Sequence, residues 1–275
     1  AILRALEEAT RAHVFEEVEP LGSYRFSHAL LREALYARLS SSRRIELHCR
    51  AGRALEQRYA DSEHLPLAAL VHHFSQSPFH GDLERAIEYA VRAAQDALRM
   101  LAYPETIEFY RRGLESMERM FPRDNERFAP LLQGLALAQR GAGQHAEAID
   151  TYGRLIVQTR KVADPERFAH AVLGLEEARF FARAPAPSSI PLLHVALRGL
   201  SQGPSTLRVH VLMTLANKLT IVNDPRRDQV SAQALALARR LDDPLTLSTA
   251  LLTRHWVIWG AHSRPERLRI HEELL

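Results

Sequence analysis

From Ser40 to its end, the chain is a succession of amphipathic helical segments separated by short breaks. The segments are roughly 10 to 20 residues long, which is the usual length of a globular helix. Two breaks, Asn223-Asp224-Pro225 and Asp242-Asp243-Pro244, place an acid before a proline, the residue order found where a helix ends and another begins. Short connections make consecutive helices antiparallel neighbours, so the chain is constrained to an all-α array of helix pairs.

The same signals give approximate helix boundaries. The run Ser40-Ser41-Ser42 is expected to cap the first helix of the series and Asp82 the third, while Pro104 fits the first turn of the fourth. Residues 183–190 (RAPAPSSI) have the composition of a linker. The predicted helices cover residues 43–59, 65–74, 83–101, 103–120, 128–140, 145–162, 165–182, 192–200, 205–220, 226–241, 244–259 and 265–275.

Strand signals occur only near the start of the chain. Residues 14–18 (VFEEV) and 23–27 (SYRFS) flank a turn in which Pro20 and Gly22 supply the geometry. Helical patterns over residues 3–13 and 29–39 enclose this hairpin. The order helix, hairpin, helix is that of the second half of a winged-helix domain.

Small and aromatic residues recur in a degenerate tetratricopeptide pattern. On the helix after Gly143, a small residue, an aromatic and an apolar residue share one face, and an earlier helix pair repeats the theme. Two such matches and several more helices favour an α-solenoid over a four-helix bundle, whose core cannot hold about a dozen helices. The residues of the pattern are Ala148, Tyr152 and Leu155, and before them Ala93, Ala94, Ile107, Tyr110 and Leu114.

A set of aromatic residues can be interpreted in two ways. Either they belong to the core between helix pairs, which we expect, or they line a peptide-binding groove. The set is Phe109, Tyr110, Tyr152, Phe168, Phe180 and Phe181.

Composition and motifs exclude several classes of function. A surplus of three positive charges (36 Lys and Arg against 33 Asp and Glu) makes no nucleic-acid surface by itself. The lone Cys49 lacks a nucleophile motif and is expected to be buried. No apolar run is long enough for a membrane span, the N-terminus lacks the pattern of a signal peptide, and both ends fall within helical patterns, so we expect a cytoplasmic fragment of a longer protein.

Catalytic and metal motifs are missing too. The sequence holds no GxxxxGK[ST] phosphate loop, no HExxH or CxxC zinc signature, and no GxSxG elbow to support Ser27 and His28 as a catalytic pair. His72 and His73 are adjacent rather than on one helical face. We therefore expect no catalytic residue, no metal site and no cofactor within this chain.

Residues 24–36 (YRFSHALLREALY), continued by Arg38-Leu39 and by residues 43–48 (RRIELH), resemble the end of the winged-helix domain of STAND-class signalling ATPases. The resemblance is to bacterial regulators in which an origin-recognition-like AAA ATPase precedes tetratricopeptide-like repeats. Residues 85–114 and 236–275 are similar to the repeat region of the same family. The FSHALLRE motif is the most specific part of this match.

The resemblance implies a multidomain switch. Residues 1–40 would be the second half of the winged helix, 41–82 connecting helices, 83–183 tetratricopeptide-like repeats and 184–275 further repeats. An upstream nucleotide-binding domain would hold ATP or ADP, and the repeats would bind an unknown protein or small-molecule ligand. DNA would be bound only by an absent output domain of LuxR or OmpR type, or a nucleotide cyclase would replace that domain.

In that family a winged-helix histidine contacts the diphosphate of ADP, and the motif similarity places His28 at this position. A protonated imidazole is a suitable donor to a phosphate. The alternative is a helix-capping or core histidine. Two other functions stay open: a free-standing tetratricopeptide scaffold, and DNA binding by the basic residues around the hairpin, which nearby acids offset.

Overall fold

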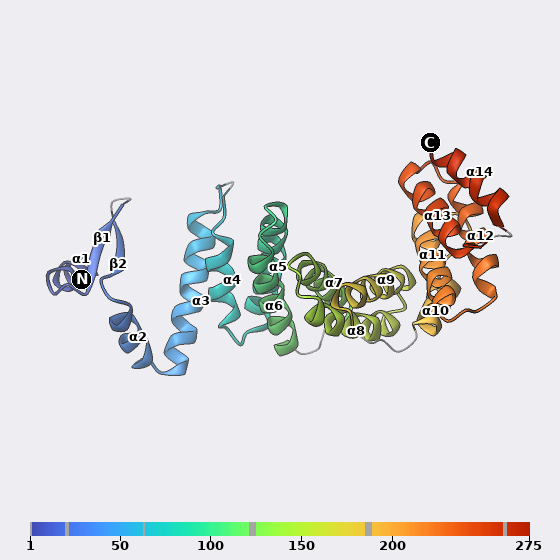
Figure 1. Ribbon diagram of the computed structural model, residues 1–275. Coiled ribbons are helices and arrows are strands. Elements are labelled where there is room, and N and C mark those ends of the chain that lie inside the picture. The colour runs from blue at the N-terminus through green and yellow to red at the C-terminus, as the bar shows by residue number, and fades with distance from the viewer. Residues whose placement is uncertain (1, 20–21, 63, 121–124, 185–188, 261–262) are drawn as a thin grey trace. The chain divides into compact units, whose positions relative to one another are not determined.

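The computed structural model describes residues 2–19, 22–62, 64–120, 125–184, 189–260 and 263–275. These residues form 14 helices and one two-stranded hairpin (Figure 1). The chain divides into two compact units, Ala1–Tyr89 and Ala90–Leu275, and the boundary falls inside helix α5 (His80–Arg99). The predicted division at residues 40, 82 and 183 stays a prediction.

The first unit begins with the expected helix, hairpin and helix: α1 (Ile2–Arg11), β1 (Phe15–Val18), β2 (Ser23–Phe26) and α2 (Ala29–Ala37). The strands are antiparallel, with Phe15 opposite Phe26 and their ring centroids 4.6 Å apart. Gly22 has a φ of 83°, which an L side chain rarely adopts, so the turn needs its glycine. The predicted hairpin is confirmed.

Helices α3 (Ser41–Arg58), α4 (Leu67–Ser75) and the start of α5 complete this unit. Ser40 caps α3 as expected, its Oγ accepting from the Arg43 N–H at 3.3 Å. Phe74 of α4 is fully buried, and its ring fills the space that a side chain at Gly52 would need. The core around it is therefore a close contact of α3 and α4.

Asp82 does not cap α5, contrary to the prediction. The helix begins two residues earlier, at His80, and Asp82 lies buried in its first turn. Its carboxylate accepts hydrogen bonds from Ser77 Oγ at 2.7 Å and from the buried thiol of Cys49 at 3.3 Å. The acid is used for a tertiary contact between α3 and α5, which a local capping rule does not detect.

The second unit is a series of helices that each pack on the next along the chain. Asp164, Ser205 and Asp243 cap helices with their side chains, and Asp224, before Pro225, accepts the N–H of the first residue of α12, Arg226, at 2.9 Å. The bounds are α6 (Tyr103–Arg119), α7 (Asn125–Gly141), α8 (His145–Lys161), α9 (Pro165–Ala182), α10 (Ile190–Gly199), α11 (Thr206–Ile221), α12 (Arg226–Ala238), α13 (Pro244–Val257) and α14 (Arg264–Leu274).

The tyrosines of the tetratricopeptide-like pattern lie in the contacts between consecutive helices. Tyr110 of α6 packs so closely on Gly134 of α7 that an added Cβ would lie 2.3 Å from its ring, and Tyr152 of α8 packs on Gly174 of α9 in the same way. The odd-numbered helices also contact one another, α7 with α9, α9 with α11 and α11 with α13. They form one layer of the array.

The aromatic set divides between core and surface. Tyr110, Tyr152 and Phe168 are buried as expected and Phe109 is half-buried, but Phe180 and Phe181 are exposed, so the core prediction is wrong for these two. Both lie at the end of α9, past its contact with Tyr152. The confirmed fold class is an all-α array of helix pairs with one hairpin.

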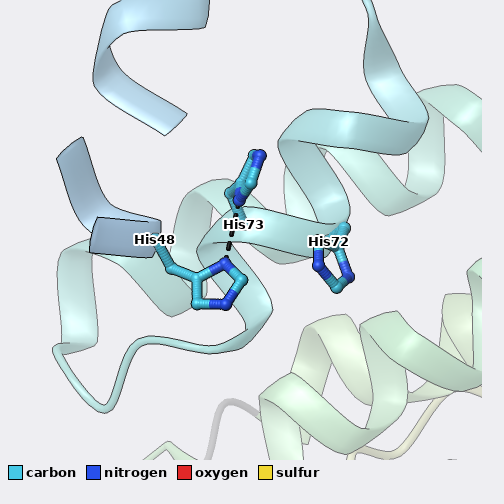
Figure 2. Close-up of side chains that lie close together, drawn as sticks. All are labelled: His48, His72 and His73. Carbon is cyan, nitrogen blue, oxygen red and sulfur yellow. Dashed lines mark hydrogen bonds between the residues drawn. The ribbon is translucent and has the colours of Figure 1, made fainter. Parts of the chain in front are cut away.

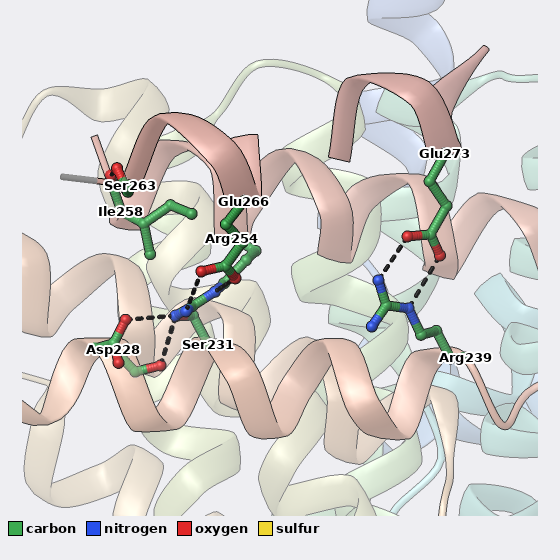
Figure 3. Close-up of polar contacts among 8 residues, drawn as sticks. All are labelled: Asp228, Ser231, Arg239, Arg254, Ile258, Ser263, Glu266 and Glu273. Atoms are coloured by element: carbon green, nitrogen blue, oxygen red, sulfur yellow. Dashed lines mark hydrogen bonds and ion pairs between the residues drawn. The ribbon is translucent and has the colours of Figure 1, made fainter. Parts of the chain in front are cut away.

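Figure 3 shows how the last three helices are joined by Arg254 of α13. Its guanidinium donates to Glu266 of α14 at 2.8 Å, and to the Asp228 carboxylate and Ser231 Oγ of α12, both also at 2.8 Å. The Arg254 side chain is only 7% exposed, whereas the neighbouring Arg239, paired with Glu273, is 50% exposed. Arg254 is thus a buried charged side chain that connects α12, α13 and α14 through hydrogen bonds.

Among the described residues, no helix has both the length and the apolar composition that a membrane span requires.

Candidate functional site

An open groove of about 750 Å³ lies on the layer of odd-numbered helices in the second unit. Helices α9, α11 and α13 supply all of its lining. These three helices are consecutive members of one layer, so their side chains face the same side of the array. The lining residues are Leu173, Glu176, Glu177, Phe180, His210, Met213, Thr214, Asn217, Lys218, Ile221, Thr249, Leu252, Thr253 and Trp256.

Large apolar side chains of the groove are open to solvent. Phe180 is 77% exposed, Ile221 77%, Leu252 58% and Trp256 62%. Single exposed apolar residues are ordinary, but four around one hollow form a patch of the kind found at binding sites. The four side chains come from three helices, α9, α11 and α13, that are not consecutive in the sequence.

The charged groups at the base of the groove are already paired. Glu176 is buried, accepts from Arg179 at 3.1 Å, and contacts the Ser189 hydroxyl and the Lys218 ammonium. Burial acts to raise the pKa of Glu176, but Lys218, Ser189 and Arg179 outweigh it and the pKa is lowered. The base thus contains one carboxylate between two cations, and its pair with Lys218 connects α9 to α11.

The uncharged polar side chains of the groove add little polarity to it, because the hydroxyls of two of its threonines are engaged within their own helices. Thr214 and Thr249 donate their hydroxyls to carbonyls of their own helices, those of His210 and Leu245. Burial lowers the pKa of His210 more than Asp243 raises it, which favours a neutral ring. A ligand for this groove would therefore gain contact mainly from apolar and aromatic surface.

His28, the predicted nucleotide contact, is exposed at the start of α2. Its backbone carbonyl accepts from Leu31 N–H at 3.1 Å, while its side chain makes no capping hydrogen bond. His28 is therefore the N-cap residue of α2 by its backbone alone, and its exposed side chain is not part of the core. The nucleotide contact itself stays a prediction.

Three histidines of the first unit converge, although the sequence predicted no metal site. His48 of α3 and His73 of α4 lie with their Nδ1 atoms 2.9 Å apart, and one nitrogen from each of His48, His72 and His73 lies within 4.8 Å of the others (Figure 2). The adjacency of His72 and His73 suggested that they could not act together. His48, on the preceding helix α3, brings a third ring nitrogen close to those of His72 and His73.

Burial and the mutual proximity of the rings govern their protonation. Burial, then His48, then His72 lower the pKa of His73 to about 4, and burial, then His72, lower that of His48. Both rings are therefore neutral at pH 7.

No family model and no curated protein matches this chain. A solved structure, the crystal structure of BtubC (BKLC) from P. vanneervenii, is similar to it with a TM-score of 0.52 and 15% sequence identity. The match covers 86% of this chain and 89% of that one. The similarity supports the helical solenoid-like fold and, at this identity, nothing beyond the fold.

Proposed function

We propose that this chain is the sensor region of a bacterial ATP-dependent signalling or transcriptional regulator in the cytoplasm, and that its ligand binds in the groove on α9, α11 and α13. The observation that carries the binding role is the exposed apolar patch of Phe180, Ile221, Leu252 and Trp256. A scaffold without a ligand has no use for such a surface, because exposed apolar patches promote aggregation.

The link to a nucleotide switch rests on the FSHALLRE resemblance. The hairpin and α2 are folded as that resemblance requires, and His28 is exposed at their junction. In this proposal an ATPase domain precedes the chain, and ligand binding on the repeats changes the retention of its nucleotide. The chain itself performs no catalysis.

A free-standing helical-repeat scaffold is the second candidate. The structural similarity to BtubC (BKLC) fits it equally well, since it extends over most of both chains and concerns the fold alone. The two candidates differ in whether the natural protein holds a nucleotide.

The natural full-length protein tests this difference. We expect it to purify with bound ADP, and His28→Ala to release ADP faster, because a charge-assisted donor to the diphosphate is lost. The matched control is His64→Ala, which removes another exposed histidine of the same unit. Bound nucleotide is measured by chromatography after denaturation.

A natural protein that holds no nucleotide would leave the scaffold as the better account. Bound ADP that His28→Ala and His64→Ala release at the same rate would reject the role of His28 but retain the ATPase class.

A further inference from the structure

The three histidines between α3 and α4 are arranged as donors toward one point. Their rings lie 5.1 to 5.3 Å apart between centroids, and their closest nitrogens are the Nδ1 atoms of His48 and His73. At 2.9 Å, two neutral rings can place only one hydrogen between these nitrogens. One nitrogen therefore directs a lone pair at the other (Figure 2).

The opposite side of the His48 ring is held by Tyr36 of α2. Its hydroxyl lies 3.0 Å from His48 Nε2, and the Arg44 guanidinium lies 4.7 Å from the centre of the Tyr36 ring. When Nε2 donates to the hydroxyl, Nδ1 carries the lone pair. Metal-bound histidines use a partner of this kind to fix the tautomer and the orientation of the ring.

We propose that His48, His72 and His73 bind a divalent transition-metal ion of the zinc class, which connects α3 to α4. Zinc accepts three neutral imidazoles and keeps a fourth position for water. The ion takes the place of the hydrogen between the two Nδ1 atoms, which moves through solvent to Nε2 of the same ring, and His72 supplies the third nitrogen. The site lies in the first unit and is independent of the groove and of the nucleotide.

The geometry requires small movements only. Nitrogens bound at about 2.0–2.1 Å in a tetrahedron are roughly 3.3 Å from each other. The two Nδ1 atoms would separate by a few tenths of an ångström from their 2.9 Å. The third nitrogen, within 4.8 Å of the others, moves inward by rotation of the exposed His72 side chain, which also leaves the site accessible from solvent.

The chemistry of the surroundings agrees with neutral ligands. His48 is buried and His73 half-buried, and the electrostatic effects on both rings come from the other histidines of the trio. The neutral imidazole is the form that binds a metal ion.

The test is a calorimetric titration of the metal-free full chain with Zn²⁺ at pH 7.5 in a buffer that does not bind zinc. We expect one equivalent to bind tightly and to raise the midpoint of thermal unfolding. His72→Ala, at an exposed position, is expected to abolish tight binding, because one of the three ligands is lost. Tyr36→Phe keeps all three ligands and is expected to weaken binding by about tenfold, through the loss of ring positioning.

The matched control is His80→Ala, because His80 is another exposed histidine of the same unit, 3.5 Å from Glu84. It is expected to bind Zn²⁺ as the unaltered chain does. Absence of a stoichiometric site, or equal binding by His72→Ala and His80→Ala, would overturn the proposal. Circular dichroism of each variant confirms that a loss of binding is not a loss of fold.

Discussion

At the scale of single residues, the two arginines of Figure 3 differ in burial more than in chemistry. Both make fork-like contacts to a glutamate of α14: Arg254 to Glu266 at 2.8 and 3.2 Å, and Arg239 to Glu273 at 3.0 and 2.5 Å. Arg239 is the C-cap residue of α12 and so connects two helices, whereas Arg254 of α13 also reaches α12, through Asp228 and Ser231, and connects three. The stability of this end of the array should therefore depend on Arg254 and little on Arg239.

We expect Arg254→Ala to lower the free energy of unfolding by about 2–3 kcal/mol, because buried hydrogen bonds to charged groups are lost. Arg239→Ala is the control and should cost less than about 1 kcal/mol, as exposed ion pairs do. Urea unfolding followed by circular dichroism measures both. Equal losses in the two variants would show that burial does not decide the contribution.

Cys49 gives a second prediction at this scale. Its thiol is buried and donates to Asp82, and burial, with the Asp82 carboxylate, raises its pKa. Since the thiolate is the reactive form, modification by a disulfide reagent at pH 7.5 should be much slower in the native chain than in urea. Rapid modification of the native chain would contradict this environment.

At the scale of helices, the array depends on pairs of one aromatic and one glycine. Tyr152 on Gly174 and Tyr110 on Gly134 bring consecutive helices closer than any larger residue allows. Composition and spacing are sufficient to predict that these tyrosines are buried, but their glycine partners lie on the next helix. The contact between each tyrosine and its glycine is a tertiary contact. It depends on how the helices pack and cannot be predicted from the spacing of residues in the sequence.

We expect Gly174→Ala to destabilise the chain by about 1–3 kcal/mol, because a Cβ 2.3 Å from the Tyr152 ring forces the two helices apart. Gly153→Ala is a control in the neighbouring helix α8, where an added Cβ meets nothing within 4 Å. It should stabilise the chain by up to about 1 kcal/mol through helix propensity. Thermal unfolding of both variants measures the difference, and changes of the same sign would contradict the packing argument.

Across the whole molecule, sequence reasoning succeeds where a signal is local. The hairpin and the caps at Ser40 and Asp243 follow from a few neighbouring residues. The groove and the histidine trio bring together residues from separate helices, and no motif spans them. The exposure of Phe180 shows the same limit, since only the placement of α11 and α13 makes it part of a groove rather than of a core.

The groove on α9, α11 and α13 is central to this account, and a neutral apolar dye such as Nile red tests it directly. The dye should gain fluorescence with the unaltered chain and lose most of that gain with Leu252→Asp, which charges the groove. Leu245→Asp is the matched control on the same helix α13, because Leu245 is 77% exposed and does not line the groove. Loss of dye binding in Leu252→Asp alone is the predicted result; equal dye binding by the two variants would contradict a binding groove on this face.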